Sequence, residues 1–419
     1  MDKLQWNVTA PVRGRYDLLV AGGGVAGLAA SVTAARQGLR VLLLERQINL
    51  GGLATTGLIN LFEPMCDGAG HPVVGGLCRE LMDAALHYGY DTLPDVWRKG
   101  GPAGPEDPRF TTRFSPQMAS LAWAELARRE GVELLLGVEI LGAEMKGKTC
   151  RGLMVQGREG PFCVEGRITV DATGDAAVLA GTGVPTARGQ NYFTYVAHEI
   201  TLDSCAQAAQ SGDIGRAVRQ IRGGSATLSG LRQPPDMPLY SGLTSDEVTE
   251  YILKNQAVLL DKLRGEDQTG RDVVTLPSMP QFRGTRHICG QHLFREEEAG
   301  LERADSLGVI TDFSRRGRLF EVSAGCLYHR EYPNLLAAGR CAGAEGFGWD
   351  ILRVIPSAIV TGQAAGALAC AALRAACPVS EAVPATQALL SGLGVPLHIA
   401  QLPSPGEERV VAGENWEEE

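Results

Sequence analysis

The feature that most constrains this chain is a glycine-rich turn at residues 22–27, which joins an apolar run to an alanine-rich segment. Residues 16–21 (YDLLVA) are typical of a buried parallel strand, and residues 25–37 (VAGLAASVTAARQ) are typical of a helix. Residues 40–44 (RVLLL) predict a second buried strand that ends at Glu45. Together these segments form one strand–helix–strand unit of about 30 residues, the length of a parallel crossover.

The glycine spacing in this turn, Gly22-x-Gly24-x-x-Gly27, predicts a dinucleotide site. The first glycine supplies a tight turn, the second lets the backbone approach a pyrophosphate, and the third lets helix and strand pack closely. The phosphates then lie at the helix N-terminus, where free N–H groups and the helix dipole favour an anion. Glu45 is placed to accept hydrogen bonds from the adenosine ribose. This unit alone leaves open whether the dinucleotide is NAD or FAD.

Three further stretches bear on that choice: residues 51–57 (GGLATTG), residues 170–175 (VDATGD), and residues 334–340 (NLLAAGR). The last of them leads to Arg353-Val354-Ile355-Pro356 and a small-residue helix at 356–376. With these stretches the sequence resembles the FAD-dependent oxidoreductases of the glutathione-reductase-like fold, in the branch with a GG-x-A-T-x-G segment after the ribose acid. The resemblance covers about residues 1–185 and 310–376 and implies that FAD is bound.

The resemblance also implies a set of cofactor contacts. They are Gly22, Gly24, Val25, Ala26, Gly27, Glu45, Arg46, Gly52, Leu53, Ala54, Thr55, Val138, Thr173, Gly174, Asp175, Gly339, Arg340, Arg353 and Ile355. Val138 corresponds to the backbone contact to adenine, residues 173–175 to a second nucleotide turn, and Gly339 with Arg340 to the turn nearest the ribityl chain. A plain helix N-cap is the alternative role for Asp175.

The small-residue helix is expected to direct its N-terminus, near residues 353–357, at the pyrimidine side of the flavin. A helix dipole with free N–H groups stabilises the negative charge of a reduced flavin at N1 and O2. The alternative is that Gly362, Gly366 and the alanines only permit close packing of a core helix. Both interpretations can hold together.

The sequence departs from the disulfide reductases of this fold. No Cys-x-x-x-x-Cys pair follows the first unit, which excludes thiol–disulfide relay chemistry. There is no second G-x-G-x-x-G, so the electron acceptor stays open among oxygen, NAD(P), a quinone and a carrier protein. The ten cysteines are scattered, without C-x-x-C or metal-ligand spacing, so we expect no metal site and no disulfide framework.

The predicted fold class is α/β: a Rossmann-like FAD-binding domain assembled from both ends of the chain, with an inserted α+β substrate or cap domain. The predicted boundaries are 1–185 and 310–400 for the FAD-binding domain, 186–309 for the cap, and 401–419 for an acidic tail. More polar and proline residues mark the cap segment.

Composition limits the partners. The 419 residues carry 39 basic and 48 acidic side chains, a net charge of −9, which makes nucleic acid an improbable partner. The N-terminus lacks the apolar core of a signal peptide, and no run of about 18 apolar residues occurs. We therefore expect a cytoplasmic protein without a membrane partner that acts on a small molecule; the oligomeric state is left open.

For catalysis, residues 276–290 (LPSMPQFRGTRHICG) resemble the family's segment that returns from the cap to the flavin. Arg286 is a candidate to clamp a carboxylate or carbonyl oxygen, and His287 to exchange a proton at neutral pH. The alternative is that both pair with acidic residues at a domain junction. Tyr192, Tyr195 and His198 are secondary candidates for the substrate pocket.

The sequence thus predicts an FAD-dependent oxidoreductase that transfers a hydride between a small organic substrate and flavin N5. Two alternatives are weighed against it: an NAD-dependent dehydrogenase, and a protein that keeps the fold for a non-catalytic binding role. The intact glycines, Glu45 and the two later turns argue against loss of the cofactor.

Overall fold

The computed structural model describes residues 9–68, 70–99 and 109–402. The predicted acidic tail at 401–419 therefore lies outside the described residues from position 403 onward. A seven-stranded sheet forms its centre. Its parallel strands run in the order β5 (Glu133–Leu136), β2 (Val41–Glu45), β1 (Val12–Ala21), β8 (Gly160–Asp171) and β16 (Leu335–Ala337). Strands from both ends of the chain therefore share one sheet, which confirms the predicted α/β architecture.

Two antiparallel strands extend this sheet. Strand β8 pairs with β7 (Thr149–Gly157), which pairs with β6 (Glu139–Lys146). Sequence analysis missed β6. The strand lies at the sheet edge and places Glu139, Glu144 and Lys146 in solvent, so its apolar signal is weak.

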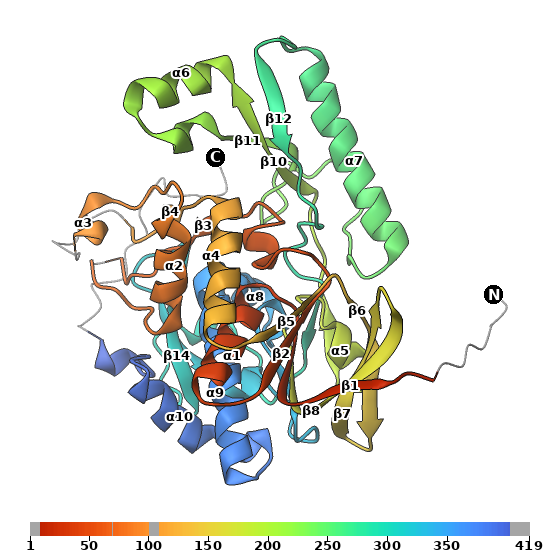
Figure 1. The fold of residues 1–419 in the computed structure, drawn as a ribbon. Coiled ribbons are helices and arrows are strands. Elements are labelled where there is room, and N and C mark those ends of the chain that lie inside the picture. The colour runs from red at the N-terminus through yellow and green to blue at the C-terminus, as the bar shows by residue number, and fades with distance from the viewer. Residues whose placement is uncertain (1–8, 69, 100–108, 403–419) are drawn as a thin grey trace.

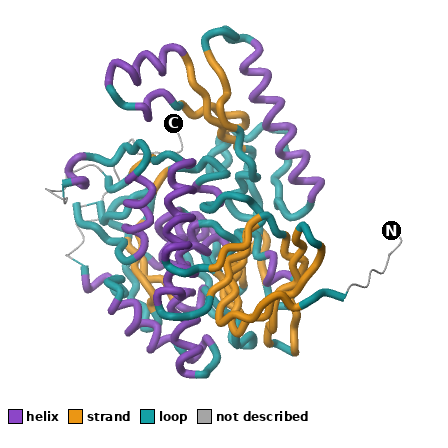
Figure 2. Tube along the Cα trace, viewed as in Figure 1, coloured by secondary structure: helices purple, strands orange, loops and turns teal. Residues whose placement is uncertain are grey.

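Helices α1 (Val25–Arg36) and α9 (Ile355–Ala375) pack against each other beside the sheet (Figures 1 and 2). A Cβ on Gly362 would lie 2.2 Å from the carbonyl oxygen of Ala26, and one on Gly366 would lie 2.4 Å from that of Ala30. The small residues of α9 are therefore required for this close contact, as one of the two interpretations of the helix predicted.

Among the described residues, α9 is the one helix long and apolar enough to cross a membrane by length and composition. Sequence analysis found no uninterrupted apolar run of this length because Ser357, Thr361 and Gln363 interrupt the segment. The whole apolar window is buried inside the protein, so α9 occupies the position of a core helix.

The segment between the two parts of the sheet leaves and returns through one antiparallel pair, β9 (Thr186–Arg188) with β13 (Arg286–Ile288). It contains the sheet β11-β10-β12 and helices α6 (Leu202–Ser211) and α7 (Ser245–Arg264), which form the upper lobe in Figure 1. The strands of this sheet are β10 (Thr194–Thr201), β11 (Arg219–Ser225) and β12 (Arg271–Thr275). The exact domain boundaries stay predictions.

Several of the remaining elements pack against α1 and α9. The remaining elements are β3 (Leu61–Phe62), α2 (Leu77–His87), α3 (Asp95–Arg98), β4 (Thr112–Arg113), α4 (Pro116–Arg129), α5 (Ala177–Ala180), β14 (Ser306–Thr311), β15 (Leu319–Ser323), α8 (Gly346–Arg353) and α10 (Val383–Gly392). Short 3-10 helices lie at Gly52–Ala54, Ile214–Ala217, Glu296–Glu298, Ala324–Cys326, Gly339–Cys341, Val379–Glu381 and Ile399–Gln401.

Candidate active site

A cavity opens where strands β1, β2, β8 and β16 end, and we call it the first cavity. All of the predicted cofactor residues line it except Gly27 and Thr55. Residues that were not among the predicted cofactor contacts also line it: Leu44, Gln47, Gly51, Ile59, Leu61, Glu63, Glu139, Ile140, Ala172, Ala177, Met279, Ala338, Val354 and Ala358. The fold thus brings parts of the chain that are far apart in the sequence to one site.

The glycine turn after β1 has the three properties that its spacing predicts. Gly22 has φ +100°, and a Cβ there would lie 2.4 Å from the carbonyl oxygen of Ala172. A Cβ on Gly27 would lie 1.8 Å from the carbonyl oxygen of Gly22, so Gly27 serves packing and does not line the cavity. Gly24 faces open space, since no atom lies within 4 Å of a Cβ placed there.

Helix α1 begins directly at this turn. Its N-cap, Gly24, supplies no side-chain hydrogen bond to the first helical turn. The first N–H groups of a helix have no partner within the helix, and these are available to an anion in the cavity. The arrangement is that of a pyrophosphate site.

The loop at residues 51–57 packs on the same turn. Gly51 and Gly24 form a bridge, and a Cβ on Gly52 would lie 3.1 Å from the Cα of Gly24. Gly51 and Gly52 have φ +106° and +55°, a region that favours glycine. Thr55 donates a 2.6 Å hydrogen bond to the carbonyl oxygen of Leu50 and stabilises the loop from within.

Glu45 is buried at the end of β2 and makes two hydrogen bonds. Its Oε2 accepts from the backbone N–H of Gly23 at 2.6 Å, and its Oε1 accepts from that of Gln47 at 2.7 Å. Each carboxylate oxygen retains a second lone pair, so the residue lines the cavity with acceptor capacity left for a ribose hydroxyl.

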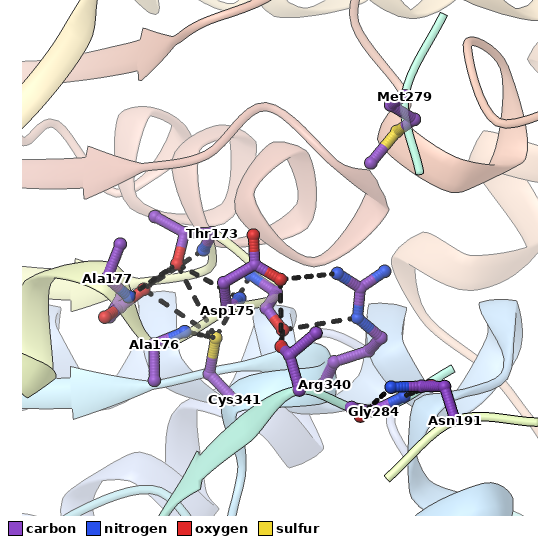
Figure 3. Close-up of polar contacts among 12 residues, drawn as sticks. Thr173, Asp175, Ala176, Ala177, Asn191, Met279, Gly284, Arg340 and Cys341 are labelled. Carbon is purple, nitrogen blue, oxygen red and sulfur yellow. Dashed lines mark hydrogen bonds and ion pairs between the residues drawn. The ribbon is translucent and has the colours of Figure 1, made fainter. Parts of the chain in front are cut away.

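Asp175 and Arg340 form a charged pair in the wall of the first cavity (Figure 3). Arg340 Nη2 donates to Asp175 Oδ1 at 3.4 Å, and Arg340 Nε donates to the carbonyl oxygen of Gly174 at 3.3 Å. Burial lowers the pKa of Arg340, and the adjacent Asp175 carboxylate opposes that effect. The N-cap of α5 is Ala176, so the alternative role of Asp175 as a plain N-cap is wrong.

The inserted segment reaches the wall of the first cavity at Met279. Thr56 Oγ1 lies 3.2 Å from Met279 Sδ, and the backbone N–H of Ser278 donates to the carbonyl oxygen of Thr56 at 2.9 Å. Sequence analysis singled out the segment 276–290 but not Met279 within it, because a single methionine in a loop carries no local signal for a site.

The observed residues fit FAD. An uncapped helix N-terminus and an open glycine turn would hold the pyrophosphate, and Glu45 would hold the adenosine ribose. At the other end, Val354, Ile355 and Ala358 bring the first turn of α9 to the cavity wall, where its positive end would face the flavin.

A second cavity of about 620 Å³ adjoins the first. The two share Leu53, Ile59, Leu61, Glu63, Arg353 and Val354. The rest of the second cavity is built by Asn60, Arg113 of β4, strands β10 and β11, and the loops near residues 226–232 and 281–283 of the inserted segment, together with residues 313–315 and Phe347. A ligand there would lie between the inserted segment and the dinucleotide.

Glu63 is the acidic residue in the shared wall. Burial raises its pKa to about 7, against the opposing charges of Arg109, Arg353 and Arg113. Within the part of the chain that the structure describes, its carboxylate has no hydrogen-bond or ion-pair partner. Sequence analysis missed Glu63, because it lies in a glycine- and proline-rich stretch without a motif.

The structure places the predicted catalytic pair, Arg286 and His287, away from the walls of both the first and the second cavity. The His287 ring is buried, lies 2.8 Å from the carbonyl oxygen of Ile288 through Nδ1, and packs edge-on against Trp349. Burial lowers its pKa, so the neutral ring is favoured. Their catalytic role stays a prediction without support from these contacts.

The secondary candidates Tyr192, Tyr195 and His198 have different surroundings and do not line the second cavity. Tyr195 lies with Ala197 in the core of the inserted segment, whereas Thr194 and Val196 point to the second cavity. Tyr192 lines a smaller side pocket with His287. His198 is buried on β10, and burial lowers its pKa.

The fold and the first cavity define a Rossmann-like dinucleotide-binding protein assembled from both ends of its chain. A family model described as FAD dependent oxidoreductase matches residues 17–202 and 308–390. The chain belongs to this family. It is therefore an FAD-dependent enzyme, and neither an NAD-dependent dehydrogenase nor a non-catalytic protein is supported.

Similar solved structures include a geranylgeranyl bacteriochlorophyll reductase-like protein from Thermoplasma acidophilum, at 14% identity and a TM-score of 0.49, covering 91% of this chain and 83% of that chain. Another is p-nitrophenol 4-monooxygenase from Pseudomonas putida, at 14% identity and a TM-score of 0.49, covering 91% and 88%. A search of curated proteins gave no match. The family assignment rests on the family model.

Proposed function

We propose that the protein transfers a hydride between flavin N5 and a small organic substrate held in the second cavity, and that Glu63 carries the accompanying proton. The observation that supports this most directly is the position of Glu63 in the wall shared by the two cavities. Bound FAD supplies the hydride acceptor or donor.

The chemistry of Glu63 suits this task. Oxidation of a carbon that carries a hydroxyl or amine removes one hydride and one proton. A carboxylate whose pKa is about 7 is present in both protonation states near neutral pH, so it accepts or returns that proton efficiently. It acts as a base in substrate oxidation and as an acid in the reverse direction.

The surrounding residues position the substrate and limit water. Leu53, Ile59, Leu61 and Val354 supply apolar surface on the shared wall. Arg353 is fixed there by Asp350, whose Oδ1 accepts from Arg353 Nε at 2.8 Å. A fixed guanidinium beside Glu63 provides charge for an oxyanion that forms during proton transfer.

The test compares Glu63→Gln with the wild-type holoenzyme. A small-molecule library is first screened anaerobically for bleaching of the flavin spectrum. With the substrate so found, Glu63→Gln should retain FAD and slow flavin reduction by about 10²-fold or more. Glu125→Gln, on the exposed face of α4, is the matched control and should reduce at the wild-type rate. A wild-type rate in Glu63→Gln would remove Glu63 from proton transfer.

A further inference from the structure

The second cavity is strongly cationic. The charged residues that line it are Arg113, Arg222, Arg232, Arg283, Arg315 and Arg353, and among the described residues Glu63 is its one carboxylate. A cavity that concentrates arginine in this way attracts anions and disfavours cations.

Two of these arginines are held by carboxylates that do not line the cavity. Arg353 pairs with Asp350 at 2.5 Å, and Arg315 Nε lies 3.0 Å from Asp312 Oδ2. Both lie on the side of the FAD-binding part of the chain, where these carboxylates partly balance their charge.

The inserted segment contributes arginines that are aimed by backbone carbonyls. Arg283 Nη1 donates to the carbonyl oxygen of Thr227 at 3.0 Å and Nη2 to that of Ala226 at 3.3 Å. Arg232 Nε donates to the carbonyl oxygen of Ser225 at 3.0 Å. These contacts fix the direction of both guanidinium groups, which prepares them for a ligand at a small loss of side-chain entropy.

Arg113 is the arginine of this cavity that lies on β4 and acts on Glu63, the acid of the proposed mechanism. It pairs with Leu61 in the β3–β4 ladder, and its charge lowers the pKa of Glu63. Among the described residues, its guanidinium makes no hydrogen bond or ion pair. Arg113 is therefore free to bind an anionic group within reach of the shared wall.

We propose that the substrate carries an oxyanion, a carboxylate or a phosphate, and that Arg113 and Arg283 bind this group in the second cavity. The carbon that is oxidised or reduced then lies on the Glu63 side. Guanidinium groups bind both oxyanions through charge-assisted, two-point hydrogen bonds. This inference rests on the proposed function, because it takes the second cavity as the substrate site.

The test uses the holoenzyme and three probes: succinate, inorganic phosphate and neutral succinamide. Binding is followed through the flavin absorbance spectrum and by calorimetry. Succinate or phosphate should bind, with an affinity that falls as salt rises, and succinamide should not. Tight binding of succinate alone assigns a carboxylate, and tight binding of phosphate alone assigns a phosphate group.

Variants locate the bound anion. Arg113→Gln and Arg283→Gln should each weaken the bound probe at least tenfold, while Arg128→Gln, exposed on α4, should not change it. Arg283→Gln also removes the hydrogen bonds to two backbone carbonyls. If that variant fails to fold, the result for Arg113→Gln decides the test. Equal binding of succinamide, or an unchanged probe affinity in Arg113→Gln, would overturn the inference. Normal FAD content and slow reduction in Glu63→Gln would still support the proposed function.

Discussion

The backbone N–H of Gly23 donates a 2.6 Å hydrogen bond to Glu45 Oε2, so the acid that ends β2 holds the glycine turn that ends β1. The second carboxylate oxygen accepts from the backbone of Gln47. Glu45 therefore connects the two strand ends between which a dinucleotide would extend, and its role in binding is coupled to the local fold.

This coupling makes a prediction for Glu45→Gln. The amide replaces one acceptor oxygen by an NH₂ group that faces a backbone N–H. We expect FAD affinity to fall by about 1–3 kcal/mol through loss of charge-assisted hydrogen bonds, together with a lower melting temperature. Flavin fluorescence titration and thermal unfolding measure the two effects. Unchanged FAD affinity would place the ribose contact elsewhere.

The purified protein is expected to be yellow and to release FAD on denaturation, and not FMN or NAD. The first cavity extends from Glu45 at the adenosine end to Ile355 at the start of α9, and FMN lacks the adenosine that Glu45 would bind. Chromatography of the released cofactor decides the point. A colourless protein that gains no absorbance near 450 nm with added FAD contradicts it.

Gly27→Ala should destabilise the fold by about 1–3 kcal/mol or more, because its methyl group would overlap the carbonyl oxygen of Gly22. Gly265→Ala is the matched control: its φ is −88°, and no atom lies within 4 Å of the added Cβ. Urea unfolding of both variants tests the argument. Similar free energies of unfolding for the two would contradict the packing role of Gly27.

The raised pKa of Glu63 predicts a pH dependence of stability. Its ordinary value is 4.5, and burial raises it to about 7 in the folded protein. Between these values the folded state keeps a proton that the unfolded chain has released, so the free energy of unfolding falls as pH rises. Glu63→Gln should lose this contribution. Urea unfolding at pH 5 and 7.5 is the measurement, and identical pH dependence in both proteins would contradict it.

His287→Ala is expected to lower the melting temperature and leave the rate of flavin reduction per bound FAD unchanged. The ring fills space against Trp349 and lines neither cavity. Flavin content and single-turnover reduction are measured on the same preparation, with Arg286→Ala beside it. A rate at least 10²-fold lower with normal FAD content would instead support the catalytic role predicted from the sequence.

Much of the fold was predictable because local signals coincide with it. Residues 18–21 of β1 and 41–44 of β2 are continuous apolar runs, and α1 and α9 are rich in small residues. By contrast, β6 carries charges at Glu139, Glu144 and Lys146, and the two-residue strands β3 and β4 are shorter than any periodic pattern. These strands exist because neighbouring segments supply their hydrogen-bond partners.

The sequence by itself determined the dinucleotide turn, the acid at Glu45 and the segments that surround the first cavity, because a close approach of backbone to phosphate requires glycine at fixed spacing. Only the tertiary structure decided which side chains line the second cavity. Glu63 and Arg113 meet at the second cavity through the pairing of β3 with β4, and the arginines of the inserted segment join them across more than a hundred residues of chain. No local pattern records such a convergence, since burial and charge at the site arise only when the segments pack together.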